Sequence, residues 1–385
     1  MDRFFVSCPL GSERATAREI EEVWPWLLGR EASRNLTATP KFHFYEGGVE
    51  FAAEMFLGLQ LNFFLKTAGR ILLRLAQFRV RDFGQLAERM ARVPLETWLS
   101  GPPDRIEIAS TASRVFHKGR IEETVRQAIS KRRFKNPTSS HRLYLRLSHN
   151  QLTVSLDTSG EHLHRRGVRT YIGEAPLRET LAALCLRALI RDRAPAELGG
   201  IRLVDPFCGS GTFLLESATL WQPNFQRKYA FQSWLRCPRL FRIPGFEKNY
   251  RLFQSPSFQS LLGFDIDPHA IEAAQKNCAA LSHPRAEFFT QDILTAQRQS
   301  SLLETWVITN PPYGDRVPLP AGPRQLVQRI LDAFTPARLG ILWPEHLLEQ
   351  ITSLNALKPH GKFKMKNGGR DVTFAIYDCQ NLLGS

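Results

Sequence analysis

The fold of this chain is decided by the stretch Ile201-Arg202-Leu203-Val204-Asp205-Pro206-Phe207-Cys208-Gly209-Ser210-Gly211-Thr212. Its first four residues predict a buried strand, and a helical pattern begins near Thr212 and continues to about Leu220. Between them, Gly209 and Gly211 allow a tight turn and a close approach to a ligand, because neither carries a Cβ atom. A strand, a glycine turn and a helix in this order indicate the ligand-binding edge of an open α/β sheet.

The rest of the C-terminal half continues the alternation of helices and strands, which predicts a mostly parallel, doubly wound sheet. The expected helices are 178–190, 212–220, 268–280, 323–334 and 344–354, and the expected strands are 201–204, 261–266, 286–290, 306–309 and 339–342. Two last strands, 362–366 and 372–378, flank the turn signal Asn367-Gly368-Gly369. We therefore expect an α/β domain whose parallel sheet is closed by an antiparallel hairpin.

The N-terminal half predicts two small α+β units in series. The first has strand 3–7, helix 13–28, a hairpin of 41–45 with 49–51, and helix 53–65. The second has strand 70–75, helix 82–91, strand 105–109, helix 121–133 and a hairpin of 143–149 with 152–157 that turns at Asn150-Gln151. The predicted domains are therefore 1–67, 68–160 and 161–385, the last with an irregular insertion at about 221–260.

Composition limits the partners and the compartment. The 385 residues carry a net charge of +14, which favours a polyanion, above all nucleic acid, over a generally basic enzyme without such a partner. No apolar run approaches the roughly 18–20 residues of a membrane span, and the N-terminus lacks a signal-peptide pattern. The six cysteines are scattered without a C-x-x-C pair. We expect reduced thiols, no metal, no membrane and a cytoplasmic protein.

Basic residues concentrate between Arg105 and Arg146, a stretch that contains eleven basic and only three acidic residues. Clustered cations neutralise phosphates and give affinity without sequence specificity. The residues expected to bind RNA are Arg114, Lys118, Arg120, Lys131, Arg132 and Arg133. A solvated basic helix face is the alternative. Phe116, Phe134 and Tyr144 are interleaved; these aromatics can stack on unpaired bases, but we favour core packing for them.

The glycine turn is a candidate cofactor site. Its residues are Asp205, Phe207, Cys208, Gly209, Ser210, Gly211 and Thr212. The helix that begins there offers free N–H groups suited to a carboxylate. Leu214 stands where a phosphate-binding Rossmann loop would carry its third glycine, which argues against a dinucleotide.

Two further carboxylates end the next strands of the same sheet. Asp265 and Ile266 end one strand, and Asp292 and Ile293 follow the next. Asp265 can accept hydrogen bonds from both hydroxyls of a ribose, and Asp292 can accept one from an adenine amino group. Taken singly, both aspartates are also typical of helix caps and turns, but successive strand ends favour ligand binding.

Asn310-Pro311-Pro312-Tyr313 follows the expected strand 306–309 and is the candidate catalytic site. Methyl transfer to an exocyclic base nitrogen or a side-chain amide places growing positive charge on an amino group. The Asn310 oxygen and the Pro311 carbonyl are fixed acceptors for its N–H groups. The two prolines stiffen the loop, and Tyr313 can stack on an extruded base. A rigid structural turn is the alternative. This chemistry needs no metal and no covalent nucleophile, so Cys208 is expected to be a turn residue.

Together these motifs give the chain a specific resemblance over nearly its whole length. It resembles the THUMP-domain class I S-adenosylmethionine-dependent RNA methyltransferases, above all the bacterial large-subunit (23S) rRNA guanine-N2 methyltransferases: the N-terminal half of the fused enzyme and its stand-alone relatives. The matching stretches are 163–169, 175–180 and 309–314 with Arg316. The resemblance implies a ferredoxin-like unit, a THUMP module and a Rossmann-like methyltransferase domain. It also implies a cofactor pocket lined by Pro176, Leu177 and Arg178, together with Asn310. An ordinary helix start, with Pro176 in the first turn and Glu179 near its positive end, is the alternative for this stretch.

The resemblance implies that S-adenosylmethionine is the cofactor and structured RNA the partner. The expected product is N2-methylguanosine, with large-subunit rRNA favoured and tRNA second. Adenine-N6 methylation and a noncatalytic RNA-binding assembly factor are less favoured alternatives. The aromatic insertion can help to grip RNA, but an accessory helical pair is the preferred interpretation. Neither the target nucleotide nor the oligomeric state can be predicted.

Overall fold

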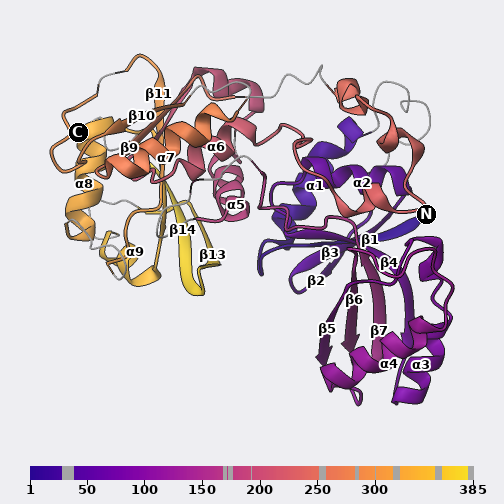
Figure 1. The fold of residues 1–385 in the computed structure, drawn as a ribbon. Coiled ribbons are helices and arrows are strands. Elements are labelled where there is room, and N and C mark those ends of the chain that lie inside the picture. The colour runs from indigo at the N-terminus through magenta and orange to yellow at the C-terminus, as the bar shows by residue number, and fades with distance from the viewer. Residues whose placement is uncertain are drawn as a thin grey trace. The chain divides into compact units, whose positions relative to one another are not determined.

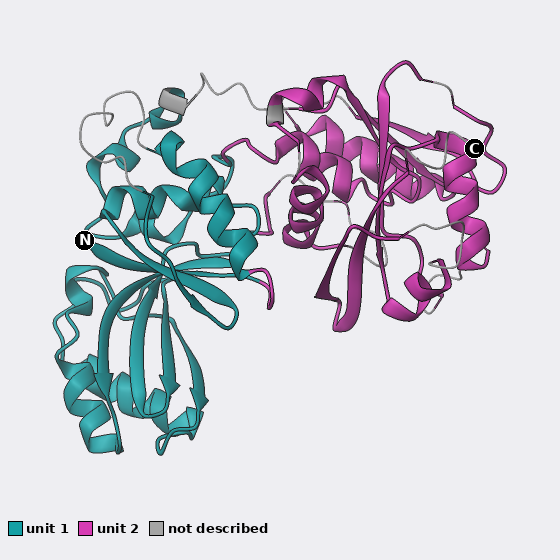
Figure 2. Cartoon of the chain, turned by 180° about the vertical axis from the view of Figure 1, so that it is seen from behind, with its two compact units in different colours: residues 1–8, 13–163, 224–252 teal, residues 9–12, 164–223, 253–385 magenta. Residues whose placement is uncertain are grey.

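The computed structural model describes residues 1–27, 39–167, 171, 177–191, 193–250, 257–281, 286–299, 301–314, 321–351 and 358–379 (Figure 1). These residues form two compact units, coloured separately in Figure 2. Unit 1 contains residues 1–8, 13–163 and 224–252, and unit 2 contains residues 9–12, 164–223 and 253–385.

Unit 1 is built on one seven-stranded sheet with the order β2-β3-β1-β4-β7-β6-β5. Its strands are β1 (Asp2–Ser7), β2 (His43–Tyr45), β3 (Gly48–Ala53), β4 (Arg70–Arg79), β5 (Arg105–Thr111), β6 (Arg142–Ser148) and β7 (Gln151–Asp157). Its helices are α1 (Glu13–Leu27), α2 (Met55–Phe64), α3 (Phe83–Ala91), η1 (Leu95–Thr97) and α4 (Lys118–Ser130). Because β4 pairs with both β1 and β7, the sheet is continuous across the predicted boundary at residue 67.

Two local predictions in unit 1 need correction. The β6–β7 hairpin turns at His149-Asn150 rather than at Asn150-Gln151, since Ser148 pairs with Gln151. Both turn residues have positive φ, 51° and 63°, as a tight two-residue hairpin turn requires. Helix α4 begins at Lys118, three residues before its first buried apolar residue, so the apolar pattern alone placed it too late.

The predicted insertion contains short 3-10 turns rather than a helical pair. They are η3 (Ala230–Ser233), η4 (Arg239–Arg242) and η5 (Phe246–Tyr250). The side chains of Phe231 and Phe241 belong to the core of unit 1, and Phe246 packs against it. The rings gathered around Phe63 of α2 belong to Phe225, Tyr229, Phe231, Phe241 and Phe246. Residues 224–252 of the insertion therefore belong to unit 1, and the rings that they bury in its core are not presented to a ligand.

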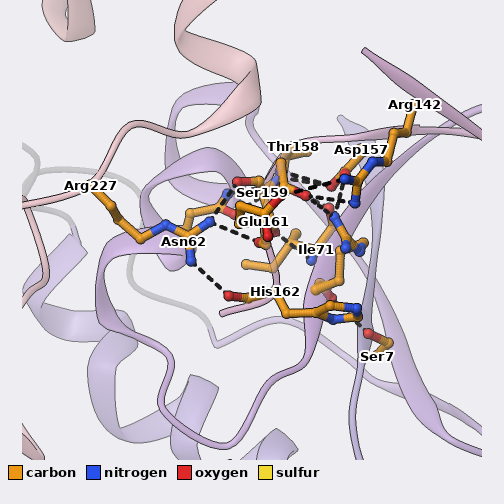
Figure 3. A network of polar contacts seen from close by, with 12 residues as sticks. Ser7, Asn62, Ile71, Arg142, Asp157, Thr158, Ser159, Glu161, His162 and Arg227 are labelled. Carbon is orange, nitrogen blue, oxygen red and sulfur yellow. Dashed lines mark hydrogen bonds and ion pairs between the residues drawn. The ribbon is translucent and has the colours of Figure 1, made fainter. Parts of the chain in front are cut away.

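A buried polar network fixes the segment that follows β7 (Figure 3). Arg70 forms an ion pair with Asp157, and the two side chains are 4% and 1% exposed. Asp157 also accepts hydrogen bonds from the backbone N–H groups of Ser159 (2.9 Å) and Gly160 (3.2 Å). Arg227 of the insertion donates to the carbonyl oxygens of residues 159, 161 and 162. The network joins β4, β7 and the insertion within unit 1.

Unit 2 contains a second seven-stranded sheet with the order β10-β9-β8-β11-β12-β14-β13. Its strands are β8 (Ile201–Asp205), β9 (Ser260–Asp265), β10 (Ala286–Thr290), β11 (Glu304–Thr309), β12 (Arg338–Trp343), β13 (Gly361–Asn367) and β14 (Arg370–Asp378). Its helices are α5 (Glu179–Ile190), η2 (Pro195–Gly200), α6 (Thr212–Thr219), α7 (Pro268–Ala279), α8 (Pro323–Phe334) and α9 (Glu345–Ile351).

The pairing in unit 2 confirms the predicted fold class. The five strands from β10 to β12 are parallel, and β14 pairs antiparallel with both β12 and β13. The hairpin turns at Gly368 and Gly369, whose φ values are +57° and +87°. Helices α5, α6 and α7 pack in one row, and α8 packs with α9. Across the described ranges, no helix is long and apolar enough to span a bilayer.

Candidate active site

The candidate site lies at the carboxyl ends of four neighbouring strands of unit 2. Asp205 ends β8, Asp265 ends β9, Asp292 follows β10 and Asn310 follows β11. The order β10-β9-β8-β11 makes these four strands adjacent. The topology therefore brings residues up to 105 positions apart in sequence to one sheet edge, the edge where open α/β sheets bind ligands.

The glycine turn has the backbone that the sequence predicts. Gly209 and Gly211 have φ values of +51° and +85°, a region of backbone conformation that residues other than glycine rarely adopt. A Cβ atom on Gly211 would lie 3.1 Å from the Phe288 ring. Gly211 is also the N-cap residue of α6, so the N-terminal, positive end of the helix dipole lies at this turn, which suits a negatively charged ligand group.

Asp205 is the most deeply buried carboxyl group of the site. It is 2% exposed and accepts a hydrogen bond from the N–H of Phe207 at 3.1 Å. Burial raises the pKa of Asp205 to about 7, and the neighbouring Asp265 carboxylate acts in the same direction. A positively charged ligand would favour the ionised form, so this carboxyl group is suited to a cationic partner.

Asp265 connects the end of β9 to the glycine turn. Its Oδ2 accepts from the N–H of Gly209 at 2.9 Å, and its Oδ1 accepts from the N–H of Asp267 at 3.0 Å. Each carboxylate oxygen has a second lone pair, which leaves acceptor capacity for two ligand hydroxyls. The cap of α7 is Asp267 rather than Asp265. Asp292 accepts from the N–H of Leu294 at 2.9 Å and so also shapes its own turn.

The other predicted cofactor residues differ in their exposure. Ser210, Thr212, Leu177, Ile293 and Cys208 are buried, whereas Ile266 is 67% exposed. Phe207 is partly buried against the apolar core of unit 2. Burial raises the pKa of the Cys208 thiol, which fits a turn residue rather than a nucleophile. Pro176 lies outside the described residues.

The Asn310–Tyr313 turn is held by two hydrogen-bond donors from elsewhere in unit 2. Trp343, the last residue of β12, donates its Nε1–H to the carbonyl oxygens of Pro311 (3.3 Å) and Pro312 (3.2 Å). Tyr313 donates its hydroxyl to Asn310 Oδ1 at 2.7 Å, and Asn367 Nδ2 donates to the Tyr313 oxygen at 3.2 Å. The sequence pattern did not single out Trp343, and it identified Asn367 only as a turn residue. The structure describes the whole of the matching stretch 309–314, whereas Asp315 and Arg316 lie outside the described residues.

The predicted RNA-binding residues fall into two groups, at opposite ends of α4. Arg114, Lys118 and Arg120 are exposed near its first turn, and Lys131 and Arg133 are exposed just after its last residue. Over 13 residues these ends are about 20 Å apart.

Arg132 and Phe116 depart from what the sequence predicted for this region. Arg132 pairs with Glu96 and donates to the Ala91 carbonyl, so it serves the packing of unit 1. We favoured core packing for Phe116, and this prediction is wrong, because the residue is 57% exposed. Phe134 does pack against the core, so only one of these two phenylalanines is available for stacking.

A parallel sheet with a glycine turn after β8, carboxylates at the next strand ends and an Asn-Pro-Pro-Tyr turn after β11 defines a class I methyltransferase domain. The chain belongs to the family described as "RMKL-like, methyltransferase domain", whose family model matches residues 166–373, more than half of the chain. The predicted resemblance is thereby confirmed. Among curated proteins, the chain is similar to the ribosomal RNA large subunit methyltransferase K/L of Shewanella amazonensis, with 29% identity over 98% of this chain and 53% of that protein.

The chain thus spans about half the length of the curated relatives that it matches. Among solved structures, it is similar to a predicted N6-adenine-specific DNA methylase from Listeria monocytogenes, with a TM-score of 0.78, 22% identity, and coverage of 98% of this chain and 96% of that one. It is also similar to a possible methylase from Clostridium difficile, with a TM-score of 0.76, 22% identity and 98% coverage of both chains. At these identities the structural likeness establishes the fold alone.

Proposed function

We propose that this protein is an S-adenosylmethionine-dependent RNA methyltransferase that forms N2-methylguanosine, with large-subunit rRNA as the favoured substrate. The observation that carries the proposal is the placement of Asn310 on the sheet edge that also holds Asp205 and Asp265. The names of the curated relatives support rRNA as the substrate class.

The side chains at the strand ends fit S-adenosylmethionine. Asp265 would accept hydrogen bonds from its ribose hydroxyls and Asp292 one from its adenine amino group. The positive end of the α6 helix dipole suits its carboxylate, and the buried Asp205 suits its positive charge. When bound, the cofactor supplies a methyl group on a sulfonium sulfur, which is electrophilic enough to need no metal.

Cofactor affinity is expected to rise with pH through neutrality. The free protein holds a proton on Asp205 below a pKa of about 7. A bound cation favours the ionised carboxylate, so binding releases this proton, and affinity rises by up to about tenfold per pH unit below the pKa. Calorimetric titration with S-adenosylmethionine across about pH 6 to 8 measures this slope. In the Asp205→Asn variant, cofactor affinity should no longer depend on pH over this range. If the slope of affinity against pH were unchanged in that variant, Asp205 would not be the group that titrates on binding.

The chemical role proposed for the Asn310–Tyr313 turn is to stabilise charge on the target amino group. Asn310 Oδ1 has two lone pairs, and Tyr313 occupies one of them. The other can accept an N–H of the base as the nitrogen becomes positive, which is electrostatic stabilisation by a preorganised dipole. The base must leave its stack to reach this turn.

The reaction and its substrate are tested together with labelled cofactor, purified protein and separate large-subunit rRNA and tRNA. Label in rRNA that digests to N2-methylguanosine supports the proposal. Label only in tRNA would favour a tRNA guanine-N2 enzyme, and N6-methyladenosine would move the target to adenine, as the description of the Listeria protein suggests for that protein. Transfer to neither RNA would contradict the enzymatic function.

We further propose that the N-terminal modules, 1–67 and 68–160, bind the RNA, and that the exposed cations beside Phe116 contribute. Replacing Arg114 and Lys118 by glutamine is expected to weaken RNA binding. The slope of log affinity against log salt should fall by about 0.7–0.9 for each phosphate that the variant no longer neutralises. Filter binding over a salt series measures it.

A matched control removes equal charge elsewhere. Arg92→Gln with Lys276→Gln deletes two exposed cations that are each paired with a glutamate one helical turn away. This control should leave the salt slope near that of the parent protein. If both double variants changed the slope equally, net charge rather than the surface at Arg114 and Lys118 would account for binding.

A further inference from the structure

The carboxamide of Asn310 can turn either its oxygen or its nitrogen toward a substrate, and only the oxygen can accept a hydrogen bond from an amino group. Rotation by half a turn about the last side-chain bond exchanges the two atoms. The proposed reaction therefore requires something that keeps the oxygen in place. Proline at the next two positions fixes the backbone, but it does not choose between the two orientations of the side chain.

We propose that Tyr313 and Asn367 form a hydrogen-bond relay that positions the Asn310 carboxamide oxygen for the reaction. The relay runs from Asn367 Nδ2–H to the Tyr313 oxygen at 3.2 Å, and from the Tyr313 O–H to Asn310 Oδ1 at 2.7 Å. It rests on the proposed function and adds a positioning residue, Asn367, which lies 57 positions beyond Asn310 in the sequence.

With the Asn367 amide donating to the phenol, a count of donors gives the direction of the relay. A phenol has one hydrogen to donate and can accept on its oxygen. Because Asn367 donates to that oxygen, the phenol hydrogen is directed to Asn310, and the atom that receives it must be an acceptor. If Asn310 presented its nitrogen, two amide donors would meet one phenol oxygen, and the phenol hydrogen would lose this acceptor. Burial raises the pKa of Tyr313 to about 12, so the phenol keeps its hydrogen through the neutral range.

The antiparallel hairpin that closes the sheet supplies this relay. Asn367 is the last residue of β13 and pairs with Arg370 across the Gly368-Gly369 turn. The partner strand β14 pairs with β12, whose final residue, Trp343, holds the two proline carbonyls. Trp343 of β12, the strand beside the hairpin, thus holds the backbone of the Asn310–Tyr313 turn. Asn367 of the hairpin holds the Asn310 side chain through Tyr313.

The phenylalanine variant separates this role from base stacking. Tyr313→Phe keeps the ring and removes the hydroxyl, whereas Asn367→Ala removes the first donor of the relay. Each is expected to lower kcat by about 10- to 100-fold through misplacement of Asn310. KM for RNA and the dissociation constant of the cofactor should change little. The double variant should be no slower than the slower single variant, because both changes break one relay.

Lys366→Gln is the matched control, since Lys366 is 66% exposed in the same hairpin and pairs with Asp371. It should leave kcat unchanged. Wild-type kcat in Tyr313→Phe, or additive losses in the double variant, would overturn the relay. An NMR spectrum of the Asn310 side-chain amide, assigned with Asn310→Ala, gives a readout without catalysis. The signal should shift in Tyr313→Phe and in Asn367→Ala.

An unshifted amide signal in both variants would overturn the relay even in an inactive protein. Conversely, a shifted signal in a protein that methylates no RNA would support the relay and contradict the proposed function. The two failures are therefore distinguishable.

Discussion

Asn310→Ala is expected to lower kcat for methyl transfer by at least about 10²–10³-fold, the usual loss when one preorganised polar group is removed from an active site. The variant loses the acceptor that would bind the target N–H as positive charge develops. Burial and strand pairing still hold Asp205 and Asp265, so cofactor affinity should stay within a few-fold of the parent value. Single-turnover transfer of labelled methyl and calorimetry of cofactor binding provide the two measurements.

Asn136→Ala serves as the control, because Asn136 is an exposed residue of unit 1 whose backbone N–H donates to the Ser100 carbonyl. It should transfer methyl groups at the parent rate. Loss of cofactor binding in Asn310→Ala would show that the residue supports the pocket rather than the reaction. Parent-level transfer would place the acceptor elsewhere.

Arg70→Met is expected to destabilise unit 1 by about 3–5 kcal/mol, because it leaves the buried Asp157 carboxylate without its cation. Methionine fills much of the volume of the arginine stem, so the lost charge rather than a cavity dominates the change. Burial already raises the pKa of Asp157 in the parent protein. Without Arg70 the folded state holds the proton still more tightly than the unfolded chain, so the stability of the variant falls as pH rises above the usual aspartate pKa.

Denaturant unfolding followed at two pH values tests this expectation. Arg92→Met is the control, since the Arg92–Glu88 pair is 67% and 58% exposed and should contribute no more than about 1 kcal/mol. Asp157→Asn combined with Arg70→Met should recover part of the loss, because the amide oxygen can still accept from the backbone at Ser159 and Gly160. Equal costs for Arg70→Met and Arg92→Met would mean that the network in Figure 3 does not stabilise unit 1.

The α/β domain could be predicted in most of its detail because its signals are local. Strand β8, the glycine turn and α6 follow one another within 19 residues, and each has its own pattern of burial or backbone conformation. The hairpin at Gly368-Gly369 is equally local, and the structure confirms it. The insertion lacked such a pattern, since its aromatic residues pack against α2, which lies far away in the sequence.

The strand-end residues of the candidate site could be predicted because their signals are local. The residues that hold them in place could not, because those contacts join distant parts of the sequence. Asp205, Asp265 and Asn310 each end or follow a recognisable strand, and the order of strands in a doubly wound sheet brings such ends together. Phe116 was placed wrongly because an aromatic residue beside a helix usually packs inward, whereas this one precedes the first turn of α4 and is exposed.

The sequence by itself determined the parallel sheet, the glycine turn and the acceptor group at Asn310, because each depends on residues that are neighbours along the chain. Only the tertiary structure decided that Asn367 and Trp343 hold that turn, that Arg132 pairs with Glu96, and that residues 224–252 of the insertion complete the core of unit 1. Hydrogen bonds, ion pairs and ring contacts between distant residues depend on strand order and register. The identity of one residue and its neighbours in the sequence does not show which distant residue it will contact in the folded protein.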